Sequence, residues 1–172
     1  MPWSLTGAGA ENPYPDGWLG GGRRIESDDQ VRGRARLMFG LDAEGAAALA
    51  VDLLASGEPL PAVWRFCLLQ LMDDYDQELR LAGAGRASAR FKQEPPATGS
   101  AEVDAALAAF AEHLARRDGW PVPGWARKPG RYAARWWFVT PLQGFHATAL
   151  QESPASFRTR GVFVTAGALS RV

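Results

Sequence analysis

The chain has 172 residues, no net charge and a hydrophobic fraction of 47%, which fits one domain with a sizeable core. Its single cysteine, Cys67, excludes an intramolecular disulfide and fits a reducing compartment. No stretch approaches the roughly 20 apolar residues that cross a bilayer, and residues 1–5 lack the basic and apolar parts of a secretory signal. We therefore expect a cytoplasmic protein without a membrane partner.

The N-terminal part, residues 1–36, is rich in Gly, Pro and polar groups and has no sustained periodicity. This composition predicts an extended or irregular arm. Four of its residues are too apolar for a freely solvated tail: Trp3, Tyr14, Trp18 and Leu19. We expect them to dock on the body of the protein or on another chain. Residues 37–172 are then a single, mostly helical domain.

The first two predicted helices follow the arm. One runs from about Asp42, a good N-cap, to Ser56, where Gly57 ends it, and Leu49, Leu53 and Leu54 define its apolar face. The next begins near Pro61 and extends to about Ala82. Its first half is apolar almost all round, which is typical of a central helix.

Residues 83–99 are predicted to form a loop, and a third helix is predicted over residues 101–117. Ser100 is its expected N-cap. Apolar residues recur at i, i+4, i+7 and i+11 on this helix, at Val103, Leu107, Phe110 and Leu114. Residues 120–125, Trp-Pro-Val-Pro-Gly-Trp, then form a linker.

Two short apolar segments, residues 136–139 and 162–164, are strand candidates in the C-terminal third. Between them, Thr140 and Pro141 signal a helix start, and Ser153 repeats that signal for a short second helix. Strands that flank a helix can pair in parallel through a right-handed crossover. The predicted fold class is α-rich α+β: a helical bundle core with a small two-stranded C-terminal β element.

Charge is divided unevenly along the chain. Residues 40–115 carry 12 acidic and 5 basic side chains, whereas residues 116–172 carry 9 basic and 2 acidic ones. Two interpretations are open. The two parts face each other within one fold, or one of them stays exposed for a partner of opposite charge.

The densest group of carboxylates is Asp73–Glu78 on the second helix. Carboxylates on one helix face can hold a divalent cation, but the third Asp comes one residue too early for an Asp-Asp-x-x-Asp motif and no second motif completes it. A solvated helix end with an Asp76–Arg80 pair is the simpler interpretation. A surface for a basic partner is the third.

The chain has two histidines, His113 and His146. His113 lies away from the apolar stripe of its helix and is expected at the surface. Neither histidine has a nucleophile in a recognisable motif, and zinc would need more ligands than these residues and Cys67 supply. We therefore expect no enzyme activity, no metal site and no cofactor.

Basic and aromatic residues are interleaved between residues 127 and 137, and two more arginines follow at 158 and 160. The residues predicted to bind a partner or a nucleic acid are Arg127, Lys128, Arg131, Arg135, Trp136, Arg158 and Arg160. Such side chains suit a protein partner, or they grip phosphates while aromatic rings stack on bases. The alternative is a connector whose tryptophans enter the core and whose arginines meet the acidic helix.

Three segments, residues 137–141, 147–150 and 153–164, resemble the C-terminal part of uncharacterised bacterial regulator-like and antitoxin-like proteins, some of them neighbours of nucleotidyltransferase-type toxins. The Ser-Pro-Ala-x-Phe-Arg-x-Arg-Gly core begins at Ser153. Such proteins often carry an N-terminal helix–turn–helix, and residues 1–60 contain nothing like one, which argues against a repressor. The resemblance implies an antitoxin-like or defence-associated accessory protein that binds a protein partner, such as a toxin. The alternative is a nucleic-acid-binding accessory factor or regulator.

Overall fold

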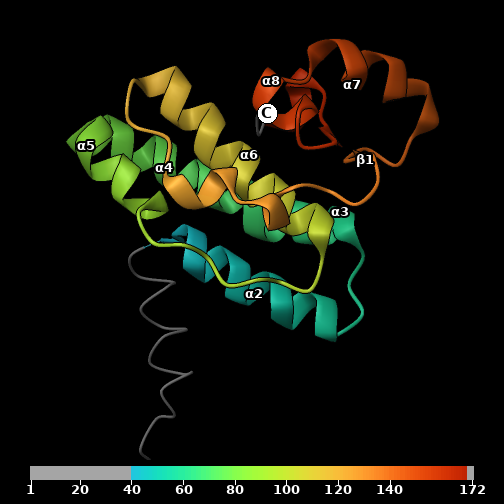
Figure 1. Cartoon of the computed structure of the whole chain (residues 1–172), viewed down its shortest axis with the longest axis horizontal. Helices are drawn as coiled ribbons and strands as arrows, with labels where there is room; N and C mark the ends of the chain where they lie inside the picture. The colour runs from blue at the N-terminus through green and yellow to red at the C-terminus, as the bar shows by residue number, and fades with distance from the viewer. Residues whose placement is uncertain (1–39, 170–172) are drawn as a thin grey trace, which may run out of the picture.

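The computed structural model describes residues 40–169 (Figure 1). The predicted arm and its apolar residues lie outside this range. Within the range, helices form the body, and a two-stranded parallel sheet lies beside the C-terminal helices, which confirms the α-rich α+β fold class. No helix in residues 40–169 is long and apolar enough to cross a membrane.

Helix α2, Ala43–Ala55, begins and ends close to its predicted bounds. The Asp42 carboxylate accepts a hydrogen bond from the Gly45 amide at 2.7 Å and so caps the first turn. Its buried face consists of small residues, Ala43, Gly45, Ala46, Ala47 and Ala50. The predicted leucine face is only partly buried and packs at the edge of the core, because the small residues allow a closer approach to α6.

The long second helix is confirmed, with a π-helical turn inside it. Its three parts are α3, Leu60–Val63, the π turn, Trp64–Leu68, and α4, Leu69–Ala82. The π turn lies in the most apolar part of the helix. It buries Trp64, whose ring centroid is 5.3 Å from that of Phe110. Gly83, with a positive φ of 79°, ends the helix as predicted.

The predicted loop over residues 83–99 is wrong for its first half. Helix α5, Ala84–Ala87, and the 3-10 turn Ser88–Phe91 occupy it. Phe91 is fully buried, and its ring centroid lies 5.9 Å from that of Tyr75 on α4. The glycines in this segment lower its helix propensity, and the burial of Phe91 outweighs them.

Helix α6, Ala101–Asp118, lies at the centre of the fold (Figure 1). Ser100 Oγ accepts a hydrogen bond from the Val103 amide, and Gly119 ends the helix in the left-handed conformation. The predicted stripe is fully buried: Val103, Leu107, Phe110 and Leu114. Helices α2 and α8, from opposite ends of the described chain, both pack on α6. The 3-10 turns Gly124–Arg127 and Pro129–Arg131 pack on it as well.

The predicted parallel strand pair is confirmed. Strands β1, Trp137–Phe138, and β2, Val162–Phe163, pair with Trp137 opposite Val162 and Phe138 opposite Phe163. Side chains alternate along a strand, so the Trp137 and Val162 pair faces the core and the two phenylalanines lie on the opposite side of the sheet, where Phe163 is buried and Phe138 is partly buried.

We name residues 129–169 the C-terminal element. Besides the two strands it contains α7, His146–Glu152, and α8, Ala155–Arg158, with 3-10 turns at Gln143–Phe145 and Ala166–Leu169. Helix α7 therefore begins later than the signal at Pro141 predicts. Ser153 does not cap α8 as predicted. Its hydroxyl donates to the Ala149 carbonyl at 2.6 Å and accepts from the Val164 amide at 2.7 Å. Ser153 thus ties the end of α7 to the chain that leaves β2.

Candidate interaction surface

Arg160, in the turn after α8, is buried and held within the chain. Its Nη1 lies 2.5 Å from the Glu112 carboxylate on α6 and donates to the Ser156 carbonyl at 2.8 Å. Its Nη2 donates to the Ala126 carbonyl at 2.8 Å, and the guanidinium lies 5.6 Å from the centroid of the Tyr132 ring. Arg160 joins the C-terminal element to α6, which corrects the expectation that it faces a partner.

Arg131 is the second predicted binding residue that is buried. Its Nη2 donates to the Pro95 carbonyl at 2.5 Å and lies 3.4 Å from the Glu94 carboxylate. Its Nη1 is 3.6 Å from Asp104 on α6, and the guanidinium lies 5.3 Å from the centroid of the Trp125 ring. Like Arg160, it is held within the chain, as the connector alternative expects, but the carboxylates that the two arginines reach are Glu94, Asp104 and Glu112 rather than those of the acidic run Asp73–Glu78.

Part of the uneven charge of the sequence is neutralised by pairs inside the fold. Side chains of the basic C-terminal third meet the acidic middle in the pairs Arg116–Glu112, Arg117–Asp76, Lys128–Glu94, Arg131–Glu94, Arg131–Asp104 and Arg160–Glu112. The structure thus supports the interpretation that the two parts face each other.

The other five predicted residues are exposed: Arg127, Lys128, Arg135, Trp136 and Arg158. Lys128 pairs with Glu94 at 2.6 Å. The three arginines of this group form no ion pair with any residue in the range 40–169. Gly161, with a positive φ of 75°, lies against Arg135 and Trp136, since a Cβ there would be 3.8 Å from the Arg135 carbonyl oxygen and from the Trp136 ring.

Aromatic rings cover the outer side of the two-stranded sheet. The ring centroid of Phe163 lies 5.2 Å from that of Trp136 and 5.0 Å from that of Phe138, and Phe138 in turn stacks on His146 at 4.0 Å. We name these four residues the aromatic face. Trp136 ends the stack and is 71% exposed. A large apolar side chain so exposed, in contact with other rings, is typical of a binding surface.

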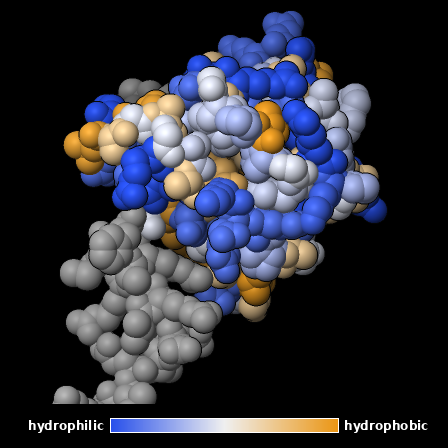
Figure 2. Space-filling model, turned by 60° about the vertical axis from the view of Figure 1, so that its left-hand side comes forward, coloured by the Kyte–Doolittle hydropathy of each residue, from blue (hydrophilic) through white to orange (hydrophobic). Residues whose placement is uncertain are grey.

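Exposed apolar side chains continue from the aromatic face toward α7, at Leu142, Phe145 and Leu150. Leu150 follows His146 by four residues and so lies on the same side of α7. On the face of the molecule in Figure 2, hydrophobic residues form small separate spots among hydrophilic ones. Of the eight large hydrophobic side chains that are exposed within residues 40–169, four lie between 136 and 150, so this stretch is the best candidate for a contact surface.

The acidic run Asp73–Glu78 makes contacts within the fold. Asp76 lies 2.5 Å from Arg117 of α6, so the predicted pair with Arg80 is wrong. Within residues 40–169, no group of three His, Cys, Asp or Glu side chains is placed to hold a metal ion. The run therefore stabilises the packing of α4 rather than forming a visible ligand set.

Cys67 and His113 both lie in surroundings that shift the pKa of their side chains. Burial raises the pKa of the Cys67 thiol to about 12, so the thiol stays protonated near neutral pH. His113, predicted at the surface, is half-buried, with its ring centroid 5.8 Å from that of Phe157. Desolvation lowers its pKa, because the charged imidazolium is disfavoured there.

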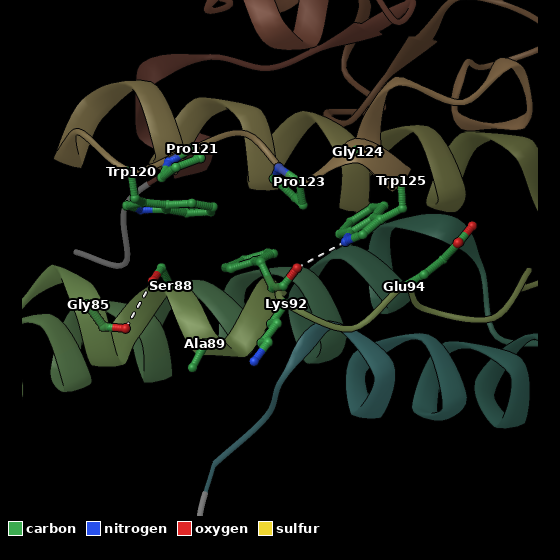
Figure 3. Close-up of a pocket in the computed structure, with 11 residues that line it drawn as sticks. Gly85, Ser88, Ala89, Lys92, Glu94, Trp120, Pro121, Pro123, Gly124 and Trp125 are labelled. Carbon is green, nitrogen blue, oxygen red and sulfur yellow. Dashed lines mark hydrogen bonds between the residues drawn. The ribbon is translucent and has the colours of Figure 1, made fainter.

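A cleft that the sequence did not predict lies between α5 and residues 120–125 (Figure 3). Its volume is about 670 Å³. Its lining includes Trp120, Pro121, Pro123 and Trp125 on one side and Ser88, Ala89 and Lys92 on the other. The signal that could have revealed it is the spacing of two tryptophans around two prolines, which we interpreted as a linker.

Comparison of the chain with protein-family models, with curated proteins and with solved structures gave no match.

Proposed function

We propose that the protein is a non-enzymatic interaction protein that binds a protein partner through the aromatic face. The observation that carries this proposal is Trp136, 71% exposed at the end of a stack of aromatic rings and adjacent to the exposed Arg135. Tryptophan and arginine are the residue types that most often dominate protein–protein binding energy. The exposed side chains of Leu142, Phe145 and Leu150 enlarge the same surface.

The kind of partner follows from the resemblance of residues 153–161 to antitoxin-like proteins. These residues shape the site, because Arg160 fixes the turn and Gly161 lies against Trp136. We propose a defence-associated accessory protein of antitoxin-like kind, whose partner is a toxin. The exposed arginines at 127, 135 and 158 favour a partner surface with acidic groups.

Nucleic-acid binding is the second candidate function. Trp136 could stack on a base while Arg135 contacts a phosphate. Because Arg131 and Arg160 are buried in ion pairs, only four of the predicted basic residues remain exposed for phosphates. Each phosphate contact adds about −0.9 to the salt slope, so this loss weakens the second candidate relative to the first.

The test compares capture from the native host by the full chain, by Trp136→Ala and by Leu81→Ala. Leu81 is the matched control, since it is 77% exposed and belongs to α4 rather than to the aromatic face. We expect the same partner with the wild-type chain and with Leu81→Ala. With purified partner, Trp136→Ala should weaken Kd by about 30-fold, the effect of a strong hot spot.

Equal affinity of the partner for wild type and Trp136→Ala would contradict the proposal. Nuclease treatment separates the two candidates, because a protein partner stays bound after nucleic acid is digested. Binding to single-stranded DNA that weakens steeply with salt, and that Arg135→Ala reduces, would favour the second candidate.

A further inference from the structure

A groove runs along the junction between residues 85–97 and residues 120–131. One half is the cleft of Figure 3, and the other half has a volume of about 660 Å³. The second half is lined by Pro95, Pro96, Pro129, Lys128 and Arg131, among others. Glu94 lines both halves, so they adjoin. We name the two halves together the seam groove.

The walls of the seam groove are rich in aromatic rings and prolines. The indole N–H of Trp120 donates to the Tyr75 hydroxyl at 2.8 Å, and that of Trp125 donates to the Phe91 carbonyl at 2.9 Å. These bonds fix both rings along one wall, opposite residues 85–92 (Figure 3). Rigid grooves lined by aromatic residues bind extended, proline-containing segments, because such segments lose little conformational entropy.

The polar groups of the groove favour an occupant with carboxylates. Lys92 is exposed and forms no ion pair with any residue between 40 and 169. Glu94 is already neutralised: its hydrogen bond with Lys128, with a further contribution from Arg131, holds the pKa of its carboxyl below the usual range. Lys92 is therefore the basic group of the groove that an acidic occupant can reach.

The arm contains a segment with this chemistry. Residues 11–18 read Glu-Asn-Pro-Tyr-Pro-Asp-Gly-Trp. They combine two prolines and two aromatic residues with two carboxylates, and they include no basic side chain. Proline restricts both itself and the residue before it to extended conformations.

The arm also joins the body beside the groove. The Leu41 amide donates to Asp74 at 2.6 Å, and the Leu41 carbonyl accepts from Arg90 Nη1 at 2.7 Å. Arg90 lies between Ala89 and Phe91, which both line the groove. The residues between 18 and 40 span at most about 3.3–3.6 Å each, or roughly 70 Å in total, which is ample to reach it. The tether also raises the local concentration of the segment to about millimolar.

From these observations we propose that residues 11–18 bind in the seam groove of the same chain. The two prolines and Tyr14 lie against the tryptophan wall, and Asp16 meets Lys92. This contact is separate from the aromatic face, and it is independent of the function proposed above.

The test is disulfide trapping in the full chain. Gly17→Cys places a thiol within the segment, and Gly85→Cys places one in the groove. The matched control pairs Gly17→Cys with Gly144→Cys, because Gly85 and Gly144 are both exposed, lack a positive φ and have nothing within 4 Å of the position that a Cβ would take. A second control pairs Ser27→Cys with Gly85→Cys. Cys67 stays in place, since it is fully buried.

We expect the Gly17→Cys/Gly85→Cys pair to form an intramolecular disulfide roughly tenfold faster than either control in a glutathione buffer. Non-reducing electrophoresis and peptide mass spectrometry report the product. Gly124 lines the groove, and nothing lies within 4 Å of the position that a Cβ would take there. Adding Gly124→Leu to the Gly17→Cys/Gly85→Cys pair should therefore fill the groove and slow disulfide formation without lowering Tm. Equal rates in all pairs would overturn the proposal. Cross-linked dimers would overturn it too, because the groove would then hold the arm of a second copy.

Discussion

The helical body and the C-terminal element are held in place by different interactions. In the body, α2, α4 and α6 meet through apolar side chains, and Phe110 packs on Trp64 with ring centroids 5.3 Å apart. In the C-terminal element, the buried guanidinium groups of Arg131 and Arg160 reach carboxylates on or near α6. The body therefore depends on the volume of its side chains, whereas the C-terminal element also depends on charge balance. The two regions should respond to different substitutions.

The largest expected effect is in the body. Phe110→Ala removes a fully buried ring that contacts both Trp64 and Phe157, so it should lower the free energy of unfolding by about 3–5 kcal/mol. Urea denaturation measures this change. Leu81→Ala, at an exposed site, should change it by less than about 0.5 kcal/mol. A loss below about 1 kcal/mol for Phe110→Ala would show that apolar packing does not dominate the body.

The charge balance of the C-terminal element is tested at Arg160. Arg160→Ala leaves the buried Glu112 with only the exposed Arg116 as an ion-pair partner and should destabilise the fold by about 3 kcal/mol. Replacing both residues, as Arg160→Met with Glu112→Gln, should restore most of the loss because no buried charge remains. A double variant as unstable as Arg160→Ala alone would mean that the hydrogen bonds of Arg160, rather than its charge, hold the element.

A helix cap gives a smaller effect and marks the edge of the body. Asp42→Ala removes the acceptor for the Gly45 amide and should cost about 1 kcal/mol. Hydrogen exchange should become faster in the first turn of α2 and stay unchanged in the C-terminal element. Faster exchange in both regions would show that they unfold as one unit.

The smallest expected effect is a pH dependence from His113, at the contact between the two regions. Its pKa in the folded state is lowered below 6.5, chiefly by desolvation, so protonation favours the unfolded state. The neutral ring contributes its stability above pH 6.5, and this contribution is lost as the pH falls through that value. Urea denaturation between pH 7.5 and about 5.5 should show the loss, and His113→Gln should reduce the slope. An unchanged slope would assign it to other groups.

The sequence predicts those elements whose signals are local. Asp42 and Ser100 cap their helices, and the four apolar residues of the α6 stripe are buried as their spacing indicates. The parallel strand pair is also predicted correctly, because short apolar segments on either side of a helix have few other arrangements. Helix α5 escapes prediction because its stability comes from Phe91, which packs against residues of other elements.

The candidate site is predictable only in part. The sequence predicts that Trp136 and Arg135 bind a partner, and the structure places both at the surface. It cannot distinguish them from Arg131 and Arg160, since burial of those two depends on carboxylates far away in the sequence. The same reason hides the seam groove, whose two walls come from segments that only the tertiary fold brings together.

The π turn at Trp64–Leu68 has a consequence for how this chain can vary in length. A π turn accommodates one more residue than an α-helical turn over the same span. Deleting one residue there would convert the π turn into an α-helical turn over the same span, so α3 and α4 would keep their relative phase. Met72 and Tyr75 would then still face the interior that they now fill. Deleting one residue early in the regular part of α4 would instead rotate the later side chains by about 100° and turn them away from the interior. The π turn is thus the place in this helix where the chain can become one residue shorter without disturbing the core.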